Sequence, residues 1–219
     1  MFAFAIRLAN KMYHFIDKRL LLQFVRGKWR IDREVRALTG GGLLASICDG
    51  RASFLPWEYE EPVATSLLDK EDRSQSQWLL YREKGYLDNK ENVTASGDVT
   101  RQYLYEFPKA KPIQIYHCTT KKDMNAATDP IANFISSSFM ENGFFHELMF
   151  EYPNGAPSAG DETNLSSATA RVEHECKPDT YKGIIDIINE NRYSSKWSVT
   201  GPQKSYEIHT IYERLKEPI

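Results

Sequence analysis

The sequence predicts an all-β protein: a single antiparallel β-barrel of about 8–10 strands, preceded by an N-terminal helix. Three observations carry this prediction. Apolar and polar residues alternate with a period of two in run after run beyond residue 26, and turn-forming residues separate the runs. No long helical pattern lies between these runs. The chain has 219 residues, which is enough to bury the core of one barrel.

Residues 1–26 are expected to form a basic amphipathic helix. Phe4, Leu8 and Phe15 belong to an apolar stripe with the spacing of one helix face, and both charged residues before Asp17 are basic. Three interpretations remain open for this segment. It can pack on the barrel or dock on a partner protein, it can be an uncleaved mitochondrial targeting segment, or its first 25 residues can contact a membrane surface. No apolar run is long enough to cross a membrane.

Residues 27–219 are expected to form the barrel, with long connections at 58–76, 119–141 and 153–167. Connections of this length are usually functional lids, partner-binding insertions or mobile segments. The strand-like runs cover residues 28–36, 51–57, 77–83, 101–107, 112–118, 144–152, 168–176, 181–188, 196–200 and 205–215.

The strongest local signal is Gly27-Lys28-Trp29 at the start of the first run, together with Arg214 at the end of the last. This pair resembles lipocalin-like (calycin) barrels, in which Gly-x-Trp opens the first strand and a late basic residue stacks on the tryptophan. Such a cation–π stack contributes roughly 0.5–2 kcal/mol. We therefore expect Gly27, Trp29 and Arg214 to form a structural plug at the closed end of a calycin-like barrel.

Eight short motifs, in order, resemble the family catalogued as domain of unknown function 6314. The resemblance implies a single calycin-like barrel and no established activity. This chain departs from the pattern through its longer connections and through Gln203, where a second basic residue is expected. The motifs are Gly27-x-Trp29 with Arg33, Gly50-x-Ala52-x-Phe54, Tyr81-x-Glu83-x-Gly85, Arg101-x-Tyr103, Phe145-His146, His174-x-Cys176-x-x-Asp179-x-Tyr181, Gly201-Pro202-x-Lys204-x-Tyr206 and Thr210-x-Tyr212-x-Arg214.

Strand parity predicts which side chains face the barrel interior. In the last run, Tyr206, Thr210 and Tyr212 share one face, opposite charged and polar residues. A mainly apolar cavity with a few convergent polar groups is typical of a small-molecule site, and an internal cation favours an acidic head group. The expected function is therefore non-catalytic binding of a small apolar or acidic ligand. The candidate ligand-binding residues are Tyr81, Glu83, Arg101, Tyr103, His146, His174, Lys204 and Tyr206.

Two other functions stay open. The barrel can be filled by its own side chains and act as an accessory subunit that docks through its helix and long connections into a larger complex, of which a mitochondrial complex is one option. An enzyme is less well supported: we expect no catalytic residues, because no Gly-x-Ser-x-Gly occurs and His174 and Cys176 lie side by side on one strand. We expect no cofactor or metal site, although His146, His174 and Cys176 could hold a metal and His174 could ligate haem.

Charge and cysteine content limit partners and compartment. The net charge of -2 gives no reason to expect nucleic acid, but it hides an asymmetry: residues 1–36 carry +6 and the remainder carries -8. This asymmetry indicates an interaction tail or an intramolecular clasp. Three separated cysteines and the lack of a secretory cleavage site predict an intracellular protein, mitochondrial or cytoplasmic, and not a secreted one.

Overall fold

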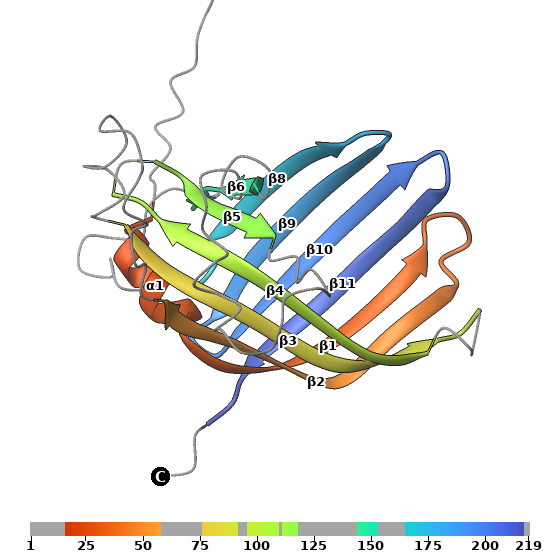
Figure 1. Ribbon diagram of the computed structural model, residues 1–219, viewed down its shortest axis with the longest axis horizontal. Coiled ribbons are helices and arrows are strands. Elements are labelled where there is room, and N and C mark those ends of the chain that lie inside the picture. The colour runs from red at the N-terminus through yellow and green to blue at the C-terminus, as the bar shows by residue number, and fades with distance from the viewer. Residues whose placement is uncertain are drawn as a thin grey trace, which may run out of the picture.

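The computed structural model describes residues 16–57, 76–91, 96–109, 111–117, 144–152 and 165–216. Eleven described strands form one antiparallel sheet that rolls into a nearly closed barrel, with a short helix at one end (Figure 1). The prediction of an all-β, single antiparallel calycin-like barrel is confirmed. The elements are α1 (Lys18–Val25), β1 (Gly27–Ala37), β2 (Leu43–Trp57), β3 (Gln77–Asn89), β4 (Gly97–Phe107), β5 (Ile113–His117), β6 (Phe144–Leu148), β7 (Phe150–Glu151), β8 (Thr169–Cys176), β9 (Asp179–Asn189), β10 (Arg192–Gly201) and β11 (Lys204–Arg214).

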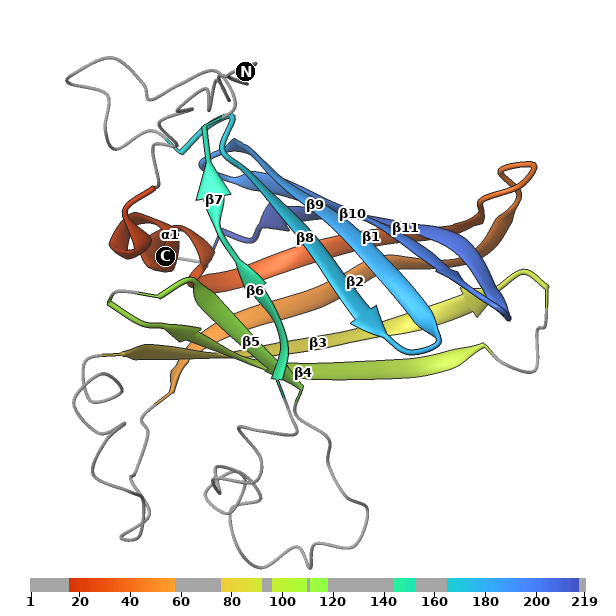
Figure 2. The same ribbon diagram turned by 90° about the horizontal axis from the view of Figure 1, so that it is seen from above.

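Helix α1 covers one end of the barrel (Figures 1 and 2). It begins after Asp17, whose carboxylate accepts a 2.8 Å hydrogen bond from the backbone N–H of Arg19 and so caps the first turn. Leu21, Leu22 and Phe24 are buried against the barrel. The described helix, Lys18–Val25, therefore has one apolar face. Residues 1–15 of the expected longer helix lie outside the described residues.

The sheet is a meander in the order β6-β5-β4-β3-β2-β1-β11-β10-β9-β8-β7, so the first and last long strands pair with each other. Each predicted run contains at least one strand. The predicted start of the second run at residue 51 is wrong, because β2 begins at Leu43. Asp49 has a φ of 52°, and the pairing with β3 shifts register between Ile47 and Arg51. This bulge places turn-like residues inside a continuous strand, which conceals the alternation.

The barrel closes where the chain changes partner at Met149. The predicted run 144–152 forms two strands: β6 pairs with β5, and β7 pairs with β8 through Phe150 and Glu151. A single chain segment thus bridges the two edges of the sheet (Figure 2). Along most of β8, no described backbone hydrogen bonds join it to β6, and this seam is the reason that the barrel is only nearly closed.

Among the described residues, no helix has the length and apolar character that crossing a bilayer requires. The long connections expected at 58–76, 119–141 and 153–167 fall almost entirely outside the described residues.

Candidate ligand-binding site in the barrel

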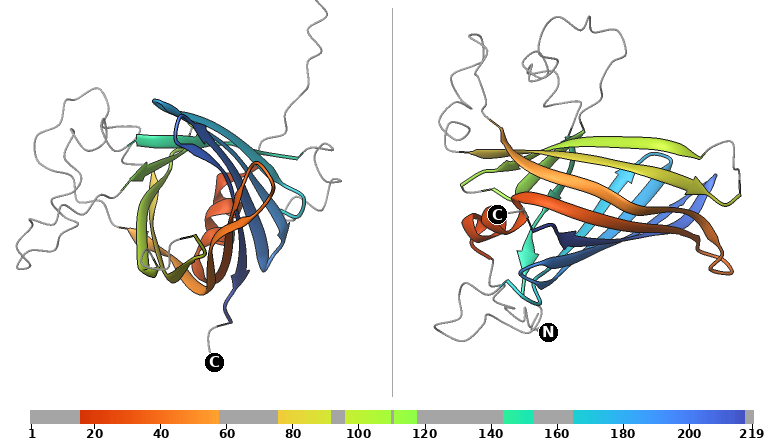
Figure 3. Two further views of the ribbon diagram at one scale, coloured as in Figure 1. Left: turned by 90° about the vertical axis from the view of Figure 1, so that its right-hand side faces the viewer. Right: turned by 90° about the horizontal axis from the view of Figure 1, so that it is seen from below.

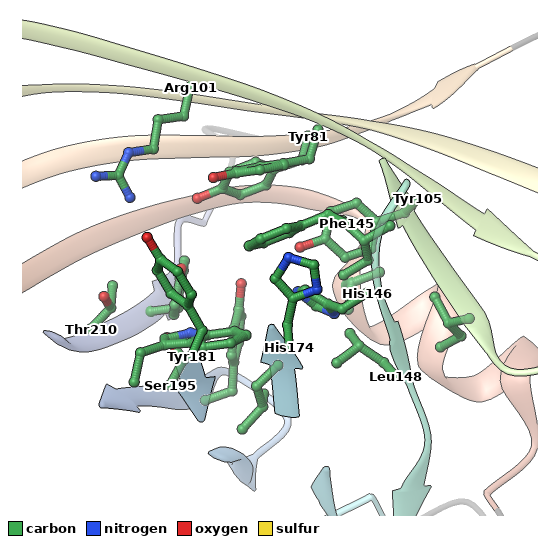
Figure 4. A pocket seen from close by; sticks show the side chains of 18 of the residues that line it. Tyr81, Arg101, Tyr105, Phe145, His146, Leu148, His174, Tyr181, Ser195 and Thr210 are labelled. Atoms are coloured by element: carbon green, nitrogen blue, oxygen red, sulfur yellow. The ribbon is translucent and has the colours of Figure 1, made fainter. Parts of the chain in front are cut away.

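The barrel encloses a cavity of about 680 Å3. The view from the end opposite α1 looks along the barrel toward the helix (Figure 3, left). In close-up, Arg101 and Tyr81 extend from one wall, and Tyr181, Thr210 and His174 extend from the facing strands (Figure 4). The lining is mainly aromatic and aliphatic, with contributions from α1 and from most of the strands. The barrel is therefore hollow, with a volume in the range of small-molecule sites.

The plug residues meet at the α1 end of this cavity. The Arg214 guanidinium carbon lies 4.3 Å from the centre of the Trp29 ring, and Trp29 is fully buried. The guanidinium also donates a 2.8 Å hydrogen bond to the carbonyl oxygen of Arg26 and another to that of Phe24. Gly27 has a φ of +110°, a backbone conformation that favours glycine, so a glycine suits the turn between α1 and β1.

These contacts join the C-terminal end of α1 to the barrel. The Trp29 indole N–H donates a 2.9 Å hydrogen bond to the carbonyl of Val25, inside the last turn of the helix. Arg214 satisfies carbonyls that the helix itself leaves unpaired. The stack and the hydrogen bonds together close one end of the cavity, so a ligand can reach it only from elsewhere.

A buried ion pair between β1 and β3 lines the cavity. The Arg33 guanidinium donates to both carboxylate oxygens of Glu83, at 2.5 and 2.9 Å, and to the Thr210 hydroxyl at 2.9 Å. The Tyr81 hydroxyl donates a 2.6 Å hydrogen bond to Glu83. Three of the five guanidinium N–H groups are thus used, and the two bonds between Arg33 and Glu83 have the bidentate fork geometry of a strong ion pair.

The pKa of Glu83 is lowered by this arrangement. Burial alone raises the pKa of the carboxyl, but the hydrogen bonds and charge of Arg33, with the Tyr81 hydroxyl, outweigh it. Glu83 is therefore ionised and neutralises Arg33. The pair contributes no net charge to the cavity.

Arg101 is different, because within the described residues it makes neither an ion pair nor a hydrogen bond. It lines the cavity and is exposed, at the end away from α1. Lys204, which the sequence also places in the site, does not line the cavity. Its ammonium forms a 2.6 Å ion pair with Asp179 and donates to the Tyr181 hydroxyl at 3.0 Å. The hydrogen bond to Asp179 raises the pKa of Lys204.

Three histidines surround the Phe145 ring on the wall formed by β5, β6 and β8. The ring centres of His117, His146 and His174 lie 4.2, 4.5 and 5.0 Å from that of Phe145. Burial, together with the neighbouring imidazoles, lowers the pKa of His146 to about 4, and burial lowers that of His117. His146 is thus a neutral imidazole near pH 7.

The residues weighed as metal ligands do not converge on one point. In the part of the chain that the structure describes, no group of three His, Cys, Asp or Glu side chains has an arrangement that could hold a metal ion. His146, His174 and Cys176 all line the cavity, as strand parity predicts, although Cys176 is exposed.

The structure brings seven of the eight candidate ligand-binding residues to one cavity and leaves Lys204 outside. The seven are Tyr81, Glu83, Arg101, Tyr103, His146, His174 and Tyr206. Strand parity also places Tyr105 on one face with Arg101 and Tyr103, and Tyr212 on one face with Tyr206, and both tyrosines line the cavity. Sequence reasoning did not assign other polar or aromatic lining residues to the site. Those that bear on the argument are Arg33, His117, Phe145, Tyr193 and Ser195.

Comparisons with known proteins agree with this architecture. A solved structure entitled "Structure of S-type Phycobiliprotein Lyase CPES from Guillardia theta" superposes with a TM-score of 0.54 at 7% sequence identity, covering 93% of this chain and 95% of that one. The likeness shows a shared fold. Curated proteins compared with the sequence give no match. The profile of the Family of unknown function (DUF6314) matches residues 25–214, a span that runs from the end of α1 to the plug arginine, and the chain therefore belongs to this family.

Proposed function

We propose that the barrel binds, without chemical conversion, a small and mainly apolar molecule that carries an acidic group. One observation carries the proposal. Two arginines line the cavity, and Glu83 forms its ion pair with Arg33. Arg101 lies across the β3–β4 pairing from Glu83, and its charge helps to lower the pKa of that carboxyl, but Arg101 forms no ion pair or hydrogen bond among the described residues. An unpaired guanidinium beside an aromatic cavity favours a ligand with a carboxylate or a similar anion.

The rest of the lining supports an apolar body for this ligand. Leu21 and Phe24 of α1, with Phe107, Ile113 and Leu148, line the part of the cavity near the helix. Burying apolar ligand surface against these side chains contributes on the order of 25 cal/mol per Å2. The ligand would therefore place its tail toward α1 and its acidic group toward Arg101.

The fold neighbour carries the name of a lyase, so a barrel of this shape is compatible with enzymatic chemistry as well. In this chain, binding without catalysis is favoured by the residues themselves. Cys176 and His174 lie two positions apart on β8, and within the described residues no hydrogen bond joins them. The accessory-subunit alternative depends on residues 1–15 and on the long connections, which the structure does not describe, and it stays a prediction.

Two measurements test the proposal. Native mass spectrometry of the protein purified from its source should reveal a stoichiometric small adduct. Isothermal titration should show that dodecanoate binds at least about tenfold more tightly than dodecanol, because only the acid can form a charge-assisted hydrogen bond with Arg101.

Arg101→Gln should remove this preference for the acid and leave the affinity for dodecanol unchanged. Arg82→Gln is the matched control, since Arg82 is an exposed arginine of the neighbouring strand and does not line the cavity. A bare mass together with equal affinities for the acid and the alcohol would overturn the proposal.

A further inference from the structure

Three tyrosine rings form a second polar region at the inner end of the cavity. Tyr193 and Tyr212 stack face to face, with ring centres 4.1 Å apart, and Tyr193 packs edge-on against the plug residue Trp29 at 4.9 Å. Tyr105 reaches the same region from β4, which is separated from β10 and β11 by several strands of the barrel. We call these three residues the tyrosine cluster.

The hydroxyl groups of the tyrosine cluster have no hydrogen-bond partner among the described residues. In this respect they differ from Tyr81, whose hydroxyl is committed to Glu83. All three rings line the cavity, and in Figure 4 Tyr105 is seen among the side chains that surround the open space. Polar groups inside proteins almost always have a partner, so the partner of these hydroxyls must come from whatever fills the cavity.

The cluster is suited to a neutral partner. Burial, together with the neighbouring Tyr212 and Glu83, raises the pKa of Tyr105 and of Tyr193 well above its ordinary value, so both phenols stay protonated and can donate as well as accept. A second anion placed here would be buried near the ionised Glu83, with Arg33 already engaged. Burying a charge without a counter-charge is strongly unfavourable.

The distance to Arg101 sets the length of the ligand. One face of β4 carries Arg101, Tyr103 and Tyr105. Tyr105, the β4 member of the tyrosine cluster, therefore lies four residues further along the strand than Arg101. At the rise of an antiparallel strand this separation is about 13 Å. One extended molecule can therefore touch both regions.

We propose that the tyrosine cluster binds a neutral hydroxyl, carbonyl or amide group at the far end of the ligand whose acidic group lies at Arg101. This inference rests on the proposed function and narrows it. The protein would select an apolar acid with a distal neutral polar group over the plain acid and over the corresponding diacid.

The test compares three probes of equal chain length on the full chain: dodecanoic acid, ω-hydroxydodecanoic acid and dodecanedioic acid. Isothermal titration at neutral pH should give an affinity for the hydroxy acid about five- to tenfold higher than for the plain acid, as expected for one additional hydrogen bond. The diacid should bind more weakly than either, because its second carboxylate must be buried without a counter-charge.

Replacing all three cluster residues (Tyr105→Phe, Tyr193→Phe and Tyr212→Phe) should abolish the preference for the hydroxy acid over dodecanoic acid. The single substitutions, each expected to reduce the preference, serve if the triple variant does not fold. Tyr86→Phe is the matched control, because Tyr86 is 57% exposed and lies outside the cavity.

The outcomes separate the two proposals. Equal affinities for plain and hydroxy acids, or a preference that survives in the triple variant, would overturn the role of the tyrosine cluster while leaving acid binding at Arg101 intact. If none of the three acids binds, both proposals fail.

Discussion

Replacing Glu83 by glutamine tests the electrostatic design of the barrel most directly. Arg33 and Glu83 are 5% and 2% exposed, and their side chains share two hydrogen bonds. Glu83→Gln keeps the shape of the side chain but leaves the Arg33 guanidinium buried without a counter-charge. Breaking a buried pair in this way typically costs 3–5 kcal/mol, or roughly a third of the stability of an ordinary domain.

A second ion pair, between two residues of β1, provides the control. Glu34 and Arg36 are joined at 2.8 Å, but both side chains are about half exposed, at 49% and 47%. Water and salt screen such a pair, so Glu34→Gln should cost about 0–1 kcal/mol. The double variant Arg33→Met/Glu83→Leu removes both buried charges at once and should cost less than Glu83→Gln alone.

Urea unfolding followed by circular dichroism measures these free energies, and its pH dependence adds a second criterion. The pKa of Glu83 is lowered from 4.5 on folding, so the unfolded chain binds more protons in this range. The stabilisation is complete above the unfolded pKa and is lost as the pH falls through the folded one. Glu83→Gln should lack this acid-side loss. A cost within 1 kcal/mol of that for Glu34→Gln would show that the pair is not as buried as described.

Three further predictions concern the plug, the histidine wall and the cavity lining. Trp29→Ala removes a fully buried ring and should lower the free energy of unfolding by about 3–5 kcal/mol, and a near-neutral result in urea unfolding would contradict the plug. Folding lowers the pKa of His146 from 6.5 to about 4, so the unfolded state binds the extra proton and stability should fall by up to about 3 kcal/mol as the pH drops through this window. The imidazole shift followed by NMR, and a flatter stability profile in His146→Leu, check this. Gly183→Ala would place a Cβ 2.7 Å from the Trp197 ring, which lines the cavity, and should cost about 1–3 kcal/mol and alter tryptophan fluorescence, whereas Gly97→Ala meets nothing within 4 Å and should do neither.

The strands and their inward faces could be predicted from the sequence because both depend on local alternation. Tyr206, Thr210 and Tyr212 line the cavity as their shared parity in the last run predicts. The change of partner at Met149 could not be predicted in this way. No glycine, proline or other turn-forming residue interrupts the run 144–152, and only the closure of the barrel decides which half pairs with β5 and which with β8.

Partner choice among charged side chains was the least predictable part. The basic excess of residues 1–36 is partly paired within the chain, since Arg30 contacts Glu213 on β11 and Arg33 contacts Glu83 on β3. These partners lie 183 and 50 positions away in the sequence. Strand parity predicts that the Glu83 side chain faces the barrel interior, but it does not predict that Arg33 is its partner. The described arginines of β1 therefore support the intramolecular clasp more than a free interaction tail.

The same reasoning decides which cation is left for a ligand. An internal Arg or Lys was expected to favour an acidic molecule, yet Lys204 is bound to Asp179 and Arg33 to Glu83. Arg214 donates its hydrogen bonds to backbone carbonyls at the end of α1. A cation already engaged in structure cannot also supply binding free energy without breaking that structure. Under the proposed function, recognition of an acid therefore falls to Arg101, the cavity-lining arginine that makes no ion pair or hydrogen bond among the described residues.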